Sequence, residues 1–157
     1  MQRYLGIDPG ANGCFCFLSE GEIVFEPMPL IGKELNFEKL NQIFGVAVDT
    51  FAVLEKVMPF KGGLQGAFNY GRNVGALEAM LAAYRIPFKH VAPITWQKVM
   101  FEGLSKNRVP NPKDRALLAA RRIFPHANLL ATERSKKPHD GMVDSLLLAE
   151  YGRRTYR

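Results

Sequence analysis

Residues 4–18 read YLGIDPGANGCFCFL and indicate how the fold begins. Two runs of strand-forming residues, 4–8 and 13–18, flank a turn rich in proline, glycine and asparagine. These turn residues predict an antiparallel hairpin at the start of the chain. A third strand is expected over residues 22–26, because apolar and polar side chains alternate there until Pro27 ends the pattern. The fold should therefore open with three antiparallel strands.

Beyond this hairpin the chain alternates between helix and strand patterns. Residues 36–47 predict a helix with Asn36 as its N-cap, and the apolar run 51–54 predicts a buried strand that ends at Glu55. The later elements expected are a glycine-rich loop over 58–66, a helix over 67–84, a strand over 87–91, and helices over 94–100, 111–124 and 140–151. The apolar stripe of the 67–84 helix is expected to contain Phe68, Val74, Leu77, Met80, Leu81 and Tyr84.

The length of 157 residues suits one hydrophobic core and is too short for two ordinary domains. We therefore expect a single domain over residues 1–157. Its class should be α/β, with elements in the order βββαβαβα and a mixed five-stranded sheet flanked by helices.

Charge is distributed unevenly along the chain, whose formal net charge is +6. Residues 1–79 contain six Lys/Arg and nine Asp/Glu, a balance of −3, whereas residues 80–157 contain fifteen and six, a balance of +9. A basic half of this kind favours binding to a phosphate backbone, although a charge that serves only solubility is the alternative.

The sequence also indicates a compartment. No apolar stretch approaches the roughly 18 residues that span a bilayer, and the N-terminus lacks a secretory signal pattern, so we expect a cytoplasmic protein without membrane contact.

Cys14 and Cys16 are the only cysteines. Two cysteines at i, i+2 on a strand would form a strained disulfide, and without a neighbouring histidine they do not make a zinc site. Buried thiols are the favoured interpretation.

Four carboxylates stand where a phosphodiester hydrolase would need them. They are Asp8 after the first strand, Glu55 at the end of the fourth strand, and Asp140 with Asp144 at the start of the last helix. The last two are four residues apart and so share one helix face. Together the four could hold two Mg²⁺ ions, for which Mn²⁺ substitutes; such a pair activates water and stabilises the leaving oxygen. This order of elements and acids is the ribonuclease H-like pattern.

Each acid also has an ordinary structural interpretation. Asp8 in an Asp-Pro-Gly sequence could be a turn residue, and Glu55 could pair with a neighbouring cation. Asp140 could be only an N-cap, and Asp144 could merely complement the helix dipole. Their joint occurrence in this order of strands and helices favours the catalytic interpretation.

Four segments resemble one family over nearly the whole chain. They are GIDPG (6–10), LEKV (54–57), YGRNVG (70–75) and HDGMVDSLLLA (139–149). These segments resemble the RuvC-type Holliday-junction resolvases of the ribonuclease H-like superfamily. The last helix, with its Asp-Gly-x-x-Asp sequence, is similar to the phage-like branch of that family.

The resemblance implies a homodimer that nicks two opposed strands of a four-way DNA junction, with no organic cofactor. Its metal ligands would be Asp8, Glu55, Asp140 and Asp144, although His139 leaves the first ligand on the last helix open. Lys113 matches a basic catalytic residue of the family, and Lys98 matches a second basic residue with a shift of register. Phe60 would be the aromatic side chain that wedges into the junction, or alternatively packs on its own domain, and Lys61 would contact phosphate.

The resemblance also bears on the dimer and the DNA surface. The 67–84 helix would lie at the two-fold axis, where Gly71 and Gly75 permit close approach, or these glycines serve packing within one chain. Further DNA contacts are expected from Arg72, Arg134, Lys136 and Lys137. Trp96 could contact DNA, but packing under its helix is favoured.

Two rival functions are compatible with the same residues. The same metal site could serve a ribonuclease H-like nuclease that acts on other branched DNA or on RNA/DNA hybrids. A junction-binding protein without cleavage is the second rival, and the presence of all four acids argues against it.

Overall fold

The computed structural model describes residues 2–56 and 63–156, and Phe60 and Lys61 lie outside this range. Five strands form the main sheet in the order β3-β2-β1-β6-β7. Their bounds are β1 Arg3–Asp8, β2 Cys14–Ser19, β3 Glu22–Pro27, β6 Thr50–Glu55 and β7 Phe88–Val91. Strand β1 pairs antiparallel with β2 and parallel with β6, so the sheet is mixed. The expected opening of three antiparallel strands and the expected fold class are confirmed.

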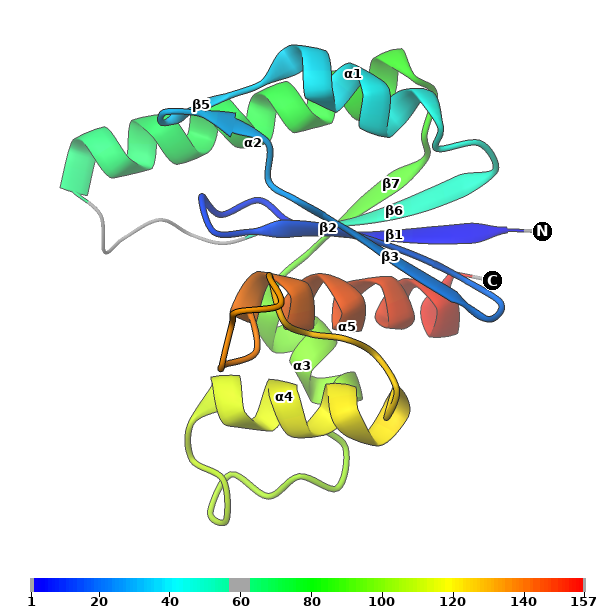
Figure 1. Cartoon of the computed structure of the whole chain (residues 1–157), viewed down its shortest axis with the longest axis vertical. Helices are drawn as coiled ribbons and strands as arrows, with labels where there is room; N and C mark the ends of the chain where they lie inside the picture. The colour runs from blue at the N-terminus through cyan, green and yellow to red at the C-terminus, as the bar shows by residue number, and fades with distance from the viewer. Residues whose placement is uncertain (1, 57–62, 157) are drawn as a thin grey trace.

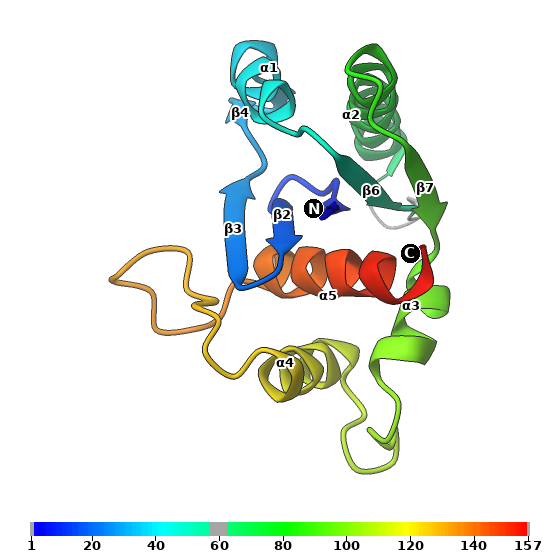
Figure 2. The same cartoon turned by 90° about the vertical axis from the view of Figure 1, so that its right-hand side faces the viewer.

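Helices cover both faces of this sheet (Figures 1 and 2). Helices α1 (Phe37–Gly45) and α2 (Gly63–Ala83) lie over one face. Helix α5 (Asp140–Thr155) packs directly on the other face, and α3 (Pro93–Met100) and α4 (Pro112–Ile123) lie outside it. The predicted N-cap of α1 is present, because Asn36 Oδ1 accepts a hydrogen bond from the Lys39 backbone N–H at 3.1 Å.

The alternation of side chains along β1 divides the core in two. Leu5 and Ile7 point towards α1 and α2, whereas Tyr4 belongs to the core beneath α5. By the two-residue period of a strand, Gly6 and Asp8 lie on the same face as Tyr4. The same argument applied to β6 places Glu55 on the face of Val53, which also packs beneath α5. Both strand carboxylates therefore face α5.

Two glycines allow α5 to approach the first hairpin closely. A Cβ atom on Gly6 would lie only 1.9 Å from the Ser145 carbonyl oxygen, and one on Gly141 would lie 2.4 Å from the Asn12 carbonyl oxygen. No side chain fits at either position, so the start of α5 rests directly against the backbone of β1 and of the turn that follows it.

Some elements differ from the sequence expectations. A small hairpin of β4 (Leu30–Ile31) and β5 (Glu34–Leu35) precedes α1 and was not expected. Helix α2 already includes residues 63–66, which were expected to be loop, and α5 continues to Thr155. Phe68 is 63% exposed, so its predicted place in the buried stripe of α2 is wrong.

Cys14 and Cys16 are both free and fully buried, which confirms their interpretation as buried thiols. None of the helices in the described residues combines the length and the apolar character needed to cross a membrane.

Candidate metal centre

Asp8 and Glu55 lie at the carboxyl ends of two neighbouring parallel strands. Ile7 of β1 pairs with Leu54 of β6, so the two acids occupy the next position on each strand and point to the same face. Asp8 also takes part in the turn that follows it, because its Oδ1 accepts a hydrogen bond from the Gly10 N–H at 3.0 Å. Glu55 is almost completely buried, with 7% of its surface exposed. The carboxyl ends of parallel strands are where α/β folds commonly build their sites.

Helix α5 brings Asp140 and Asp144 to this place. His139 is its N-cap, and the His139 Nδ1 accepts a hydrogen bond from the Met142 N–H at 3.3 Å. Asp140 is therefore the first helical residue, and its interpretation as only an N-cap is wrong. Asp144 lies one turn further along the same face. With Gly141 against the hairpin turn, this end of the helix stands beside Asp8.

Electrostatic interactions connect the acids. Burial raises the pKa of Asp144 to about 8, and the charges of Asp8, Glu55 and Asp140 contribute to this rise. Burial, together with the charge of Asp8, raises the pKa of Glu55 to about 7, although a hydrogen bond from Trp96 opposes this shift. The pKa of Asp8 is also raised, mainly by burial. These carboxylates are close enough to repel one another, and cations among the described residues compensate their charge only in part.

Lys113 supplies positive charge beside the acids. It lies at the start of α4, and its Nζ donates a short hydrogen bond to Asp140 Oδ2. This bond raises the pKa of Lys113, and the Lys113 charge in turn opposes the upward shift of the pKa of Asp144. Both partners are more than half exposed, at 69% and 58%, so the pair can exchange with solvent or with another ion.

The donor set suits a hard divalent cation, since all four acids offer carboxylate oxygens and their charges are poorly compensated. The side chains do not yet form a closed cage: across residues 2–56 and 63–156, no three His, Cys, Asp or Glu side chains are grouped closely enough to hold an ion as they stand. The residues therefore fit such an ion in chemistry and location, and side-chain rotation with release of Asp140 by Lys113 would be needed to bind it.

The remaining predicted residues lie at varied distances from this centre. Arg72 on α2 forms an ion pair with Glu34 of the β4–β5 hairpin at 2.9 Å. Lys98 is exposed on α3 and, two residues from Trp96, lies about 200° around the helix from the side that meets Glu55. The structure therefore does not bring Lys98 to the acids. Arg134, Lys136 and Lys137 are exposed in the loop that leads into α5.

Trp96 is the residue of this site whose role the sequence analysis missed. Its expected packing under α3 is confirmed, since it is fully buried. In addition, its indole Nε1 donates a hydrogen bond to Glu55 Oε1 at 2.8 Å. One signal was available in the sequence: a buried tryptophan needs an acceptor for its N–H, and the helix after β7 begins beside the end of β6.

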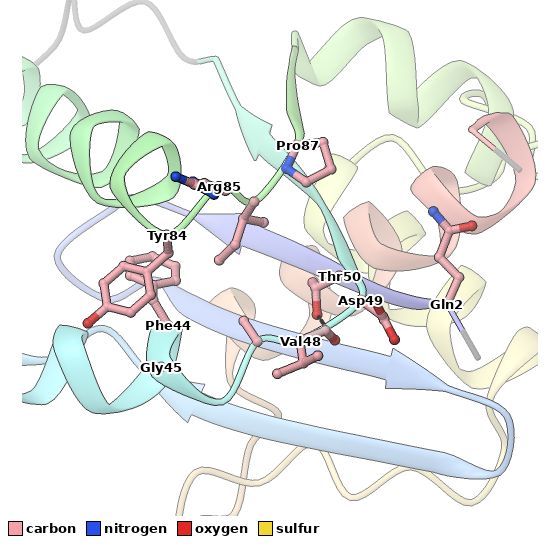
Figure 3. A pocket seen from close by; sticks show the side chains of 11 residues that line it. Gln2, Phe44, Gly45, Val48, Asp49, Thr50, Tyr84, Arg85 and Pro87 are labelled. Carbon is pink, nitrogen blue, oxygen red and sulfur yellow. Dashed lines mark hydrogen bonds between the residues drawn. The ribbon is translucent and has the colours of Figure 1, made fainter.

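A separate hollow of about 660 Å³ lies at the opposite end of the parallel strands (Figure 3). Its lining includes Gln2, Asp49, Thr50 and Pro87, which stand at or just before the amino ends of β1, β6 and β7. The strand acids Asp8 and Glu55 lie at the carboxyl ends of β1 and β6, so this hollow is not part of their site.

Comparison with known proteins gives structural neighbours only. No family model and no curated protein matches the chain. The structure of T. thermophilus RuvC in complex with Holliday junction substrate matches with a TM-score of 0.64 and 15% identity, covering 99% of this chain and 97% of that chain. A second Thermus thermophilus RuvC structure matches with a TM-score of 0.55 and 15% identity, over 98% and 96% of the two chains. The yeast mitochondrial Holliday junction resolvase Ydc2 matches with a TM-score of 0.50 and 16% identity, over 96% and 78%. At these identities the likeness concerns the fold, and the chain has the fold of RuvC.

Proposed function

We propose that this protein is a divalent-metal-dependent endonuclease that resolves four-way DNA junctions. The observation that carries the proposal is the electrostatically coupled group of Asp8, Glu55, Asp140 and Asp144 at one end of a RuvC-like sheet. The neighbour with a TM-score of 0.64 was solved with Holliday junction substrate, which supports the same substrate class here. The Asp-Gly-x-x-Asp sequence of α5 supports placing the chain in the phage-like branch.

In this proposal the four carboxylates hold two Mg²⁺ ions, or Mn²⁺ in their place. When bound, such a pair activates a water molecule and stabilises the leaving 3′ oxygen of an in-line displacement. Asp8 and Glu55 act from the rigid ends of β1 and β6, and Asp144 from the first turns of α5. Lys113 releases Asp140 to the metal and turns its ammonium group towards the scissile phosphate.

Most of the DNA surface is assigned to the basic second half of the chain, and a few contacts to residues 60–72. Arg134, Lys136 and Lys137 precede α5 directly and so flank the acids in sequence. Cations there would bind the phosphate backbone on either side of the cleaved bond. Arg72 and Lys98 are proposed as outlying contacts, and Phe60 and Lys61 as the junction wedge and a neighbouring phosphate contact.

The proposed homodimer uses an exposed stripe on α2. Leu64 is 91% exposed and Phe68 is 63% exposed, and Gly71 and Gly75 continue the stripe. At 100° per residue these four positions fall within about 60° of the helix circumference. A Cβ atom on either glycine would meet no described atom within 4 Å, which argues against packing within one chain. A second copy of α2 could therefore approach closely, and two-fold symmetry would present two active sites to paired strands.

Incubation with a synthetic four-way junction and Mg²⁺, with nick positions mapped on every strand, tests this function. Paired nicks at symmetrical positions are expected from the wild type. Asp144→Asn should bind the junction with unchanged affinity and leave it uncut, because the charge of the phosphate surface is retained and a metal ligand is removed. Preferred cleavage of an RNA/DNA hybrid or of flapped DNA at equal enzyme concentration would favour the rival nuclease, and junction binding without cleavage would favour the binding protein.

A further inference from the structure

The Trp96–Glu55 hydrogen bond joins a buried aromatic side chain to a buried carboxylate at the proposed metal centre. Trp96 is 0% exposed and Glu55 is 7% exposed, so neither group can exchange this 2.8 Å bond freely for water. The indole N–H is the only polar group of a tryptophan side chain and can only donate. Leaving it without an acceptor at this depth would be unfavourable, so the bond persists in the folded protein.

The indole ring is held in place from its other side. Phe101 packs edge-to-face on Trp96, with ring centroids 5.7 Å apart and an interplanar angle of 79°. The Arg115 guanidinium carbon of α4 lies 5.5 Å from the Phe101 ring centroid, as in a cation–π contact. A continuous line of side chains therefore runs from α4 through the end of α3 to Glu55. This packing fixes the position from which the N–H is donated.

We propose that Trp96 is a positioning residue that presents Glu55 to the metal centre, an inference that rests on the proposed function. The N–H occupies Glu55 Oε1 and fixes the carboxylate orientation, which leaves Oε2 as the oxygen available to a cation. A neutral donor achieves this without adding a positive charge that would compete with the metal. Lys113 contrasts with it, since its contact with Asp140 is exposed and must break when an ion binds. Neighbours of this kind commonly change metal affinity by roughly 10- to 100-fold.

The test compares the wild type with Trp96→Phe, which keeps an aromatic ring and removes the N–H. Calorimetric titration with Mg²⁺ and with Mn²⁺, without DNA, should show roughly 10- to 100-fold weaker binding by the variant. Junction cleavage should show a lower kcat at fixed Mg²⁺ while KM for the junction stays unchanged, because the DNA contacts are intact. Val99→Ala is the matched control: it truncates a partly exposed side chain of the same helix and should leave metal affinity unchanged.

A second measurement separates positioning from packing. Trp96 is the only tryptophan, so biosynthetic replacement by its benzothienyl analogue alters this position alone and exchanges the N–H for sulfur at nearly constant shape. The analogue should reproduce the weaker Mg²⁺ binding of Trp96→Phe with a native-like thermal melt, which also covers the case in which Trp96→Phe does not fold. In the wild type, the single indole ¹H–¹⁵N signal should shift during the Mg²⁺ titration with the calorimetric midpoint.

Three outcomes distinguish this inference from the proposed function. Equal Mg²⁺ affinity of the wild type and the analogue protein, with junctions still cut, would overturn the positioning role alone. Mg²⁺ binding that depends on the Trp96 N–H in a protein that cuts no junction would support the positioning role and reject the proposed substrate. A wild type that binds neither Mg²⁺ nor Mn²⁺ would overturn both.

Discussion

The proposed function requires Asp144 to be ionised, whereas burial and the neighbouring acids favour its protonated form. An aspartate carboxyl group has an ordinary pKa of 3.8, which burial and three neighbouring acids raise to about 8 for Asp144 in the folded protein. Between these two values the folded protein holds a proton that the unfolded chain has released. The metal-free protein should therefore become less stable as the pH rises from about 4 to 8.

Asp144→Asn should remove this penalty. At pH 8 we expect the metal-free variant to be more stable than the wild type by roughly 1 to 3 kcal/mol, and at pH 3 we expect little difference, because the wild-type carboxyl group is then mostly protonated in both states. Thermal unfolding in EDTA at the two pH values measures this. An equal change at both pH values would mean that the effect comes from packing and not from the carboxylate charge.

At the scale of single residues, the positions of the four acids within strands and helix were easier to predict than the side chains that contact them. Asp8 and Glu55 end apolar strand patterns, and Asp140 and Asp144 share a helix face by spacing alone. The partners depend on packing between distant segments: Trp96 reaches Glu55 only because α3 lies over the end of β6. His139 as the N-cap of α5 was missed for a different, local reason, because histidine is an uncommon residue at that position.

Among the elements, the contact of α5 with β1 depends on Gly6. A Cβ atom there would lie 1.9 Å from the Ser145 carbonyl oxygen and 2.5 Å from the Ala149 backbone nitrogen. Gly6→Ala should destabilise the protein by about 1 to 3 kcal/mol or more, because backbone atoms cannot rotate away. Urea unfolding measures the change. Gly66→Ala is the control, since its Cβ would meet no described atom within 4 Å and no loss of stability is expected; a Gly6→Ala variant as stable as the wild type would contradict the close packing.

Helix α2 offers a matched pair of glycine substitutions that tests the dimer. Gly75→Ala and Gly66→Ala should each stabilise the helix by up to about 1 kcal/mol. Only Gly75 lies on the stripe of Leu64, Phe68 and Gly71, whereas Gly66 lies on the opposite side of the helix. We therefore expect Gly75→Ala to weaken self-association in sedimentation equilibrium and Gly66→Ala to leave it unchanged. Equal dissociation constants for both variants would remove this stripe from the interface.

The prediction of elements succeeded where a hydrophobic period extended over several residues. Strands β1, β2, β3 and β6 have such patterns and were expected close to their observed bounds. The β4–β5 hairpin has strands of two residues each, which is too short for any alternation to be recognised. The early start of α2 was missed because Gly63 and Gly66 are poor helix formers, so the sequence favoured a loop there.

For the molecule as a whole, the uneven charge predicts a salt-dependent interaction with DNA. Changing Arg134, Lys136 and Lys137 together to glutamine should weaken junction binding. It should also reduce the slope of log K against log salt by up to about 0.9 for each phosphate that is no longer neutralised. Fluorescence anisotropy over a salt series measures both quantities. Lys39→Gln on α1, across the sheet from α5, is the control and should leave the slope unchanged; an unaltered slope in the triple variant would exclude the loop from the DNA surface.

The global arrangement was predictable because local patterns and their order agree. Three antiparallel strands followed by alternating helices and strands leave few topologies, and parallel crossovers are almost always right-handed. The order in which α3 and α4 pack outside α5 was not predictable, since both helices have short apolar faces that could have met the sheet. Their placement determines which side chains reach the acids from outside.

The buried thiols of β2 can report chemically how often the β1–β2 hairpin separates from α5. Cys14 pairs with Asp8 across the hairpin, is fully buried, and has a pKa raised to about 12 by that burial. An aromatic disulfide reagent should therefore label it only when the hairpin separates from α5, and the labelling rate then measures how often that happens. Magnesium should slow the labelling in proportion to site occupancy. A labelling rate that does not change with magnesium would place the ion elsewhere. One colorimetric assay would therefore report both opening and occupancy at the strand that carries Asp8.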